Sequence, residues 1–92
     1  MTQHYLIGEF SQLLAGLQPA PNELLEIATR DLRCDVEFGP LRALPDLARE
    51  AVALADLICA AALEAGDASL FSHYVASASA LEEFLVSANL LR

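Results

Sequence analysis

The chain is 92 residues long, which allows one domain with a single hydrophobic core. It has a net charge of −8 and five arginines but no lysine, so it lacks the clustered cations that bind nucleic-acid phosphates or an anionic membrane surface. Apolar residues make up 55% of the chain, so the net charge does not imply disorder. Because so small a domain buries a limited share of its surface, this composition favours self-association or a protein partner.

The first predicted helix covers residues 4–17, HYLIGEFSQLLAGL. Its large apolar residues recur every three or four positions on one face, which is the periodicity of an amphipathic helix. Pro19 and Pro21 end this helix in a short, stiff turn. A second helix is predicted from Asn22, a favourable N-cap residue, to about Asp35. Its buried side is expected to consist of Leu24, Leu25, Ala28 and Leu32.

The end of this second helix is less well defined by the pattern. Polar and apolar residues alternate with a period of two over residues 33–38, as they do in a strand. A lone strand has nothing in this chain to pair with, so we expect helix to about Asp35 and an irregular segment after it. A connector over residues 39–45 follows, in which Leu41 and Leu44 are expected to fill the core.

The longest predicted helix, residues 45–66, is the one around which we expect the others to pack. Pro45 and Gly66 mark its start and stop. Two neighbouring rows of apolar residues cover about half of its circumference, so helices are expected on both of its flanks. The rows consist of Leu47, Ala51, Leu54, Ile58, Ala61 and Ala65, and of Ala48, Val52, Ala55, Cys59 and Ala62. Asp56 interrupts the apolar run that a membrane span requires, so no membrane insertion is predicted.

The last helix is predicted over residues 68–91, with Asp67 as its N-cap. The short link through Gly66 and Asp67 turns it back along the central helix as a long antiparallel hairpin. Its core side is expected to consist of Leu70, Phe71, Tyr74, Val75, Ala78, Leu81 and Leu85, with Phe84 at the edge. Together these elements predict an all-α, single-domain bundle of about four helices that spans residues 1–92.

The groups that could support catalysis or bind a metal are scattered along the chain. His4 and His73 have no second ligand at helical spacing, so neither a metal site nor a cofactor is predicted. Cys34 and Cys59 are expected to be free, buried and slow to react, with a disulfide between them as the alternative. Asp56 is expected to face solvent, the alternative being a buried acid paired with an arginine. We therefore predict that the protein is not an enzyme.

The segment of residues 68–81 contains no charged residue when histidine is neutral. A solvent-exposed helix face usually carries Lys, Glu or Arg, whereas this one offers serines and alanines that let another helix approach closely. The predicted partner-binding residues are Ser72, His73, Ala76, Ser79, Ala80 and Glu83. A weakly polar face that remains in solvent is the alternative interpretation.

Two functions remain compatible with the sequence. The first is a non-enzymatic interaction or regulatory module that forms a homodimer, or binds another protein, through its last helix. The second is binding of a small apolar ligand in a cavity lined by Phe10, Leu54, Ile58, Tyr74 and Leu85. The N-terminal segment lacks the pattern of a signal peptide, which favours the cytoplasm. The lysine-free composition, rich in Leu and Ala, resembles that of proteins from high-GC bacteria.

Overall fold

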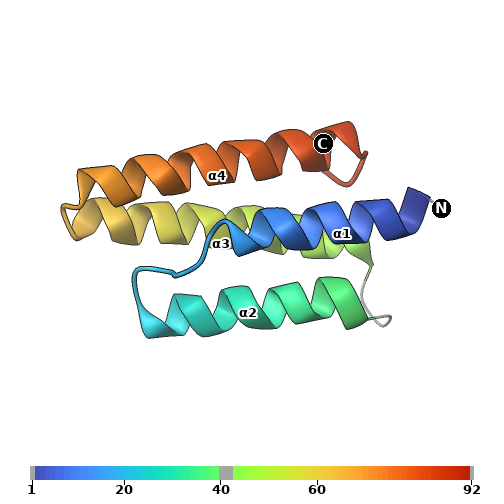
Figure 1. Cartoon of the computed structure of the whole chain (residues 1–92), viewed down its shortest axis with the longest axis horizontal. Helices are drawn as coiled ribbons and strands as arrows, with labels where there is room; N and C mark the ends of the chain where they lie inside the picture. Colours follow the sequence, from blue (N-terminus) through green and yellow to red (C-terminus); the bar gives the residue numbers. More distant parts are fainter. Residues whose placement is uncertain (1, 40–42, 92) are drawn as a thin grey trace.

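A computed structural model of the chain describes residues 2–39 and 43–91, with side chains from Tyr5 onward. Its elements are α1 (Thr2–Ala15), α2 (Glu23–Phe38), α3 (Leu44–Glu64) and α4 (Ala68–Ser87). The described residues contain no strand, and the predicted all-α bundle of four helices is confirmed. The helices run alternately in opposite directions along a body of 42 × 23 × 18 Å (Figure 1).

Each helix packs against two neighbours, and the four together form a closed ring. α3 lies between α2 and α4, and α1 completes the ring by packing against both α2 and α4. α3 and α4 form the long antiparallel hairpin that the sequence predicts (Figure 1). Gly66 turns the chain with a φ of +77°, which glycine adopts without strain. Asp67 then caps α4, because its carboxylate accepts a 3.0 Å hydrogen bond from the Leu70 N–H.

All four helices and the turn after α1 contribute apolar side chains to one core. The buried members are Phe10, Leu14, Leu17, Leu32, Val36, Leu47, Ala48, Ala51, Leu54, Ala55, Ile58, Ala62, Tyr74, Leu81 and Leu85. α3 supplies more of them than any other helix, and several are alanines. Small side chains allow neighbouring helices to approach closely, and α3 is packed on both flanks, as are the other three helices of the ring.

The buried phenol of Tyr74 links α4 to the turn between α1 and α2. Its hydroxyl donates a hydrogen bond to the Pro19 carbonyl, which satisfies the one polar atom of an otherwise apolar side chain. Burial raises the pKa of Tyr74, and the nearby carboxylates of Asp67 and Glu26 raise it further. The phenol therefore stays protonated at neutral pH and remains a hydrogen-bond donor.

α2 is longer than the sequence pattern indicates. The predicted end near Asp35 is wrong, because the helix continues to Phe38 and the Gly39 N–H then bonds to the Asp35 carbonyl at 2.9 Å. Leu32 and Val36, one turn apart, are both buried on the inner side of α2. As part of a helix, this pair is buried in the core. A strand over the same residues would have had no second strand to pair with among the described residues.

The buried side of α2 also differs from the prediction. Leu25 and Leu32 pack inward, but Leu24 is 80% exposed and Ala28 is exposed as well. Leu24 precedes Leu25 by one residue, so it is rotated by about 100° around the helix, away from the core. The inner side of α2 is therefore narrower than predicted.

α4 ends at Ser87 rather than at Leu91 as predicted. Asn89 adopts a left-handed conformation with a φ of 61°, and the Leu90 N–H bonds back to the Leu85 carbonyl at 2.9 Å. This is the geometry of a Schellman C-cap, for which asparagine is the usual substitute for glycine. The reversal brings Leu90 back against the core.

Other expected core residues lie at the edge of the bundle or outside the described ranges. Val75 is 40% exposed, because it follows Tyr74 and is rotated by about 100° away from the core. Ala65, at the end of its predicted row, is exposed. Leu44 is half-buried against the core as expected, whereas Leu41 lies outside the described residues.

The packing of α3 predicts contrasting effects for two leucines on the same helix. Leu54 is 7% exposed and Leu57 is 57% exposed. We expect Leu54→Ala to lower the free energy of unfolding by about 2–5 kcal/mol, because it leaves a cavity in the core. Leu57→Ala is expected to change it by less than about 0.5 kcal/mol. Urea denaturation followed by circular dichroism measures both, and similar losses would contradict the assignment of the inner face of α3.

Candidate functional site

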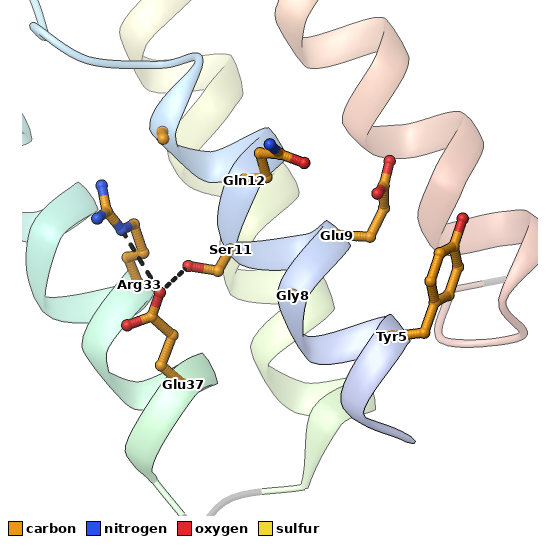
Figure 2. Close-up of a pocket in the computed structure, with 8 residues that line it drawn as sticks. Tyr5, Gly8, Glu9, Ser11, Gln12, Arg33 and Glu37 are labelled. Carbon is orange, nitrogen blue, oxygen red and sulfur yellow. Dashed lines mark hydrogen bonds and ion pairs between the residues drawn. The ribbon is translucent and has the colours of Figure 1, made fainter. Parts of the chain in front are cut away.

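A shallow hollow of about 500 Å³ lies across α1 and reaches α2 (Figure 2). Its lining consists of Tyr5, Gly8, Glu9, Ser11, Gln12, Ala15, Arg33 and Glu37. Gly8 lies in the middle of this surface, and a Cβ added there would meet no atom within 4 Å. The hollow is wide and open, so it differs from the enclosed apolar pockets that bind small molecules.

The polar side chains at one edge of the hollow form a chain of contacts between α1 and α2. The buried hydroxyl of Ser11 donates a hydrogen bond to the Glu37 carboxylate, which also lies 3.9 Å from Arg33 Nε (Figure 2). Arg33 Nη1 in turn donates to Gln18 Oε1 at 3.4 Å. A nucleophilic serine is normally activated by an adjacent general base such as histidine, whereas Ser11 faces a solvent-exposed carboxylate that already pairs with an arginine. This cluster therefore joins α1 to α2.

The predicted partner-binding residues lie together on the outward side of α4. All of them are exposed: Ser72, His73, Ala76, Ser79, Ala80 and Glu83. Over the whole of α4, the only Asp, Glu, Lys or Arg residues are Glu82 and Glu83. A shallow hollow of about 600 Å³ on this helix is lined by Ser79, Glu82, Glu83, Val86 and Ser87. The helix thus presents a surface of small and weakly polar groups.

Two exposed valines, neither of which was predicted to bind a partner, extend this surface. Val75 is 40% exposed and Val86 is 50% exposed. Val75 lies one turn before Ser79, and Val86 lies two turns after it, so all three share one side of the helix. The four-residue spacing between Val75 and Ser79 could have placed Val75 on the outward side of the helix. Its spacing fits the predicted core side almost equally well.

His73 also has a role within its own chain. Its Nε2 lies 3.1 Å from the Gly16 carbonyl and donates to it in the Nε2–H tautomer. The Ser77 hydroxyl donates to the same oxygen at 3.3 Å. These bonds satisfy a carbonyl at the end of α1 and hold α1 against α4. Of the six predicted residues, His73 is therefore the one that also holds the bundle together.

The side chains expected to line a ligand cavity are packed in the core instead. Phe10, Leu54, Ile58, Tyr74 and Leu85 have exposures between 0% and 7%. Five surface hollows of about 140–600 Å³ in the described part of the chain are lined by other side chains.

Both cysteines are free, but only one lies in a protected environment. Cys34 is exposed, so its predicted burial is wrong; it follows the buried Leu32 by two residues and points to the opposite side of α2. Cys59 is half-buried, and its pKa is raised by burial and then by the negative charge of Asp56. Asp56 itself is exposed, as expected.

The described residues contain no metal cluster and no membrane-spanning helix. No group of three or more His, Cys, Asp or Glu side chains there could hold a metal ion, and the side chain of His4 lies outside the described part. No described helix is both long enough and apolar enough to cross a bilayer. Comparison of the chain with protein-family models, curated proteins and solved structures gives no match.

The contact between α1 and α2 predicts a difference between two serines. Ser11 is 5% exposed and donates to Glu37, whereas Ser72 is exposed on α4. We expect Ser11→Ala to lower the free energy of unfolding by about 1 kcal/mol, because the lost hydrogen bond to a carboxylate outweighs the better helix propensity of alanine. Ser72→Ala should leave it unchanged or raise it slightly. Equal effects in thermal or urea denaturation would show that the Ser11 hydroxyl contributes nothing to stability.

The different environments of the thiols predict different reactivities. Thiolate is the reactive form, and its fraction at neutral pH is lowered at Cys59 by the raised pKa. We expect a thiol reagent to modify Cys34 first under native conditions and Cys59 at least about tenfold more slowly. Raising the pH should accelerate the reaction of Cys59, because deprotonation then becomes complete. In the Cys34→Ser variant Cys59 is the only cysteine left. Fast labelling of that variant at neutral pH would show that the Cys59 thiol is not protected.

Proposed function

We propose that the protein is a non-enzymatic interaction module that self-associates through the outward face of α4. This face comprises the exposed residues Ser72, Val75, Ala76, Ser79, Ala80, Glu83 and Val86. The observation that carries the proposal is the combination of exposed valines with small residues on a helix that has only two acidic groups and no Lys or Arg. Small residues permit close approach of a second helix, and removal of the valine side chains from water stabilises the dimer.

An antiparallel pairing of two α4 helices fits the order of these residues. If a two-fold axis passes between Ser77 and Ala78, then Ala76 of one copy faces Ser79 of the other, and Ser72 faces Glu83. The Ser72 hydroxyl can then donate to the Glu83 carboxylate across the interface. A parallel pair would instead bring the two Glu83 carboxylates together, which like-charge repulsion opposes.

The cellular setting is part of the same proposal. Both cysteines are unpaired thiols, which are typical of a reducing compartment such as the cytoplasm. The net charge of −8 favours a protein partner over nucleic acid. We assign no catalytic role and no cofactor to the protein.

Charge substitutions on the outward face of α4 test the proposal. We expect Ala76→Arg and Ser79→Glu each to raise the dimer dissociation constant at least about tenfold, because each places like charges near the axis and desolvates them. The double variant should restore association, since the new guanidinium at position 76 then faces the new carboxylate of the second copy at position 79. Sedimentation velocity over a range of concentrations measures the dimer dissociation constant of the two single variants and of the double variant.

Ala53→Arg is the matched control, because Ala53 is an exposed alanine on α3. It should leave the sedimentation behaviour of the parent chain unchanged, and circular dichroism should show equal helix content in all variants. A parent chain that remains monomeric at high micromolar concentration would exclude self-association. Failure of the double variant to reassociate would exclude the antiparallel register.

A further inference from the structure

α2 is apolar on two opposite sides. Its inner side packs into the core through Leu25, Thr29, Leu32 and Val36. Its outer side carries the exposed residues Leu24, Ile27, Cys34 and Phe38. Leu24 is 80% exposed and Phe38 is 76% exposed, which are the highest values among the large exposed apolar side chains described. The outer side therefore resembles a packing surface without a partner.

The spacing of these residues is that of a helix–helix interface. Positions 24, 27, 31, 34 and 38 follow one another by steps of three and four, which is the a/d pattern of two coiled-coil heptads. We call Leu24, Ile27, Asp31, Cys34 and Phe38 the outer seam of α2. In such a pattern a second helix covers the seam by inserting its own apolar side chains between these residues.

Asp31 determines which partner fits the outer seam. It is exposed at the central position, with two seam residues on each side. If two copies of α2 paired along their seams in register, the two Asp31 carboxylates would face each other, and both repulsion and desolvation would oppose that dimer. A partner helix with an arginine or lysine at this position would instead form an ion pair within an apolar contact.

The other charges of α2 favour the same kind of partner. The helix carries the carboxylates of Glu23, Glu26, Asp31, Asp35 and Glu37 against the guanidinium groups of Arg30 and Arg33. The chain as a whole has a net charge of −8. Complementary charge across an interface accelerates association and disfavours acidic competitors.

We propose that the outer seam of α2 binds an amphipathic basic helix of another protein, whose apolar residues cover Leu24, Ile27 and Phe38 and whose arginine or lysine pairs with Asp31. This inference goes beyond the proposed self-association through α4. α2 and α4 lie along opposite sides of the body, so both surfaces can be occupied at the same time (Figure 1). A dimer formed through α4 would then present two outer seams to two partner helices.

A pair of synthetic peptides provides the test. Each has three heptads with leucine at the a and d positions; one carries arginine and the other glutamate at the central a position. Fluorescence anisotropy of the labelled peptides, used at concentrations where they are monomeric, measures binding to the full chain. We expect the arginine peptide to bind the parent chain at least about tenfold more tightly than the glutamate peptide.

Two substitutions assign this binding to the outer seam. Asp31→Arg should reverse the preference, so that the glutamate peptide binds more tightly than the arginine peptide. Leu24→Asp should weaken binding of the arginine peptide at least about tenfold, because it introduces a charge into the apolar contact. Leu57→Asp, a change at an exposed leucine of α3, is the matched control and should leave binding unchanged. Circular dichroism verifies that the variants are folded.

Three results would overturn the proposal. The first is failure of the parent chain to bind either peptide at several hundred micromolar. The second is equal binding of both peptides, or a preference that Asp31→Arg leaves unchanged. The third is loss of self-association in Leu24→Asp, which would show that a second copy occupies the seam. The α4 proposal is tested independently, because Ala76→Arg is assessed by sedimentation without any peptide.

Discussion

Close packing of α3 between α2 and α4 sets the spacing of the other helices in the bundle. α3 buries side chains along its whole length, and Ala48, Ala51, Ala55 and Ala62 allow its neighbours to approach closely. Alanine removes little apolar surface from water, so the stability of the bundle depends on the larger side chains that pack between the alanines. Leu54 and Ile58 are such residues, and α1 then closes the ring over the same core.

Polar contacts determine how α1 fits into this ring. On one side, Ser11 donates to Glu37 of α2. On the other side, His73 and Ser77 of α4 both reach the Gly16 carbonyl. Directional bonds of this kind set the position of a helix more narrowly than apolar contact alone, because each requires a limited range of distances and angles. No buried side-chain polar atom in the described part of the chain is left without a hydrogen-bond partner.

A bundle of this size leaves the outward sides of its helices in water, and two of those sides differ in chemistry. The outward face of α4 combines small residues with Val75 and Val86 and has little charge, which suits a second copy of the same surface. The outer seam of α2 combines larger apolar residues with a central carboxylate, which suits a partner of opposite charge. The proposed division of roles between self-association and partner binding follows from this difference in charge.

The number of helices, the cap at Asp67, the turn at Gly66 and most of the inner face of α3 could be predicted from the sequence. The same is true of the cap at Asn22, whose side chain accepts a hydrogen bond from the Leu25 N–H. These features depend on local hydrogen bonds, backbone conformation and helical periodicity, which neighbouring residues specify. Which side chains at the edge of a helix are covered could not be predicted from the sequence, because this depends on the position of the adjacent helix. Val75 and Leu24 fitted a buried row by spacing, and Cys34 was expected to be a buried thiol, yet all three are exposed. The outer seam of α2 was missed for the same reason, because helical spacing alone does not show which of two apolar rows faces the core.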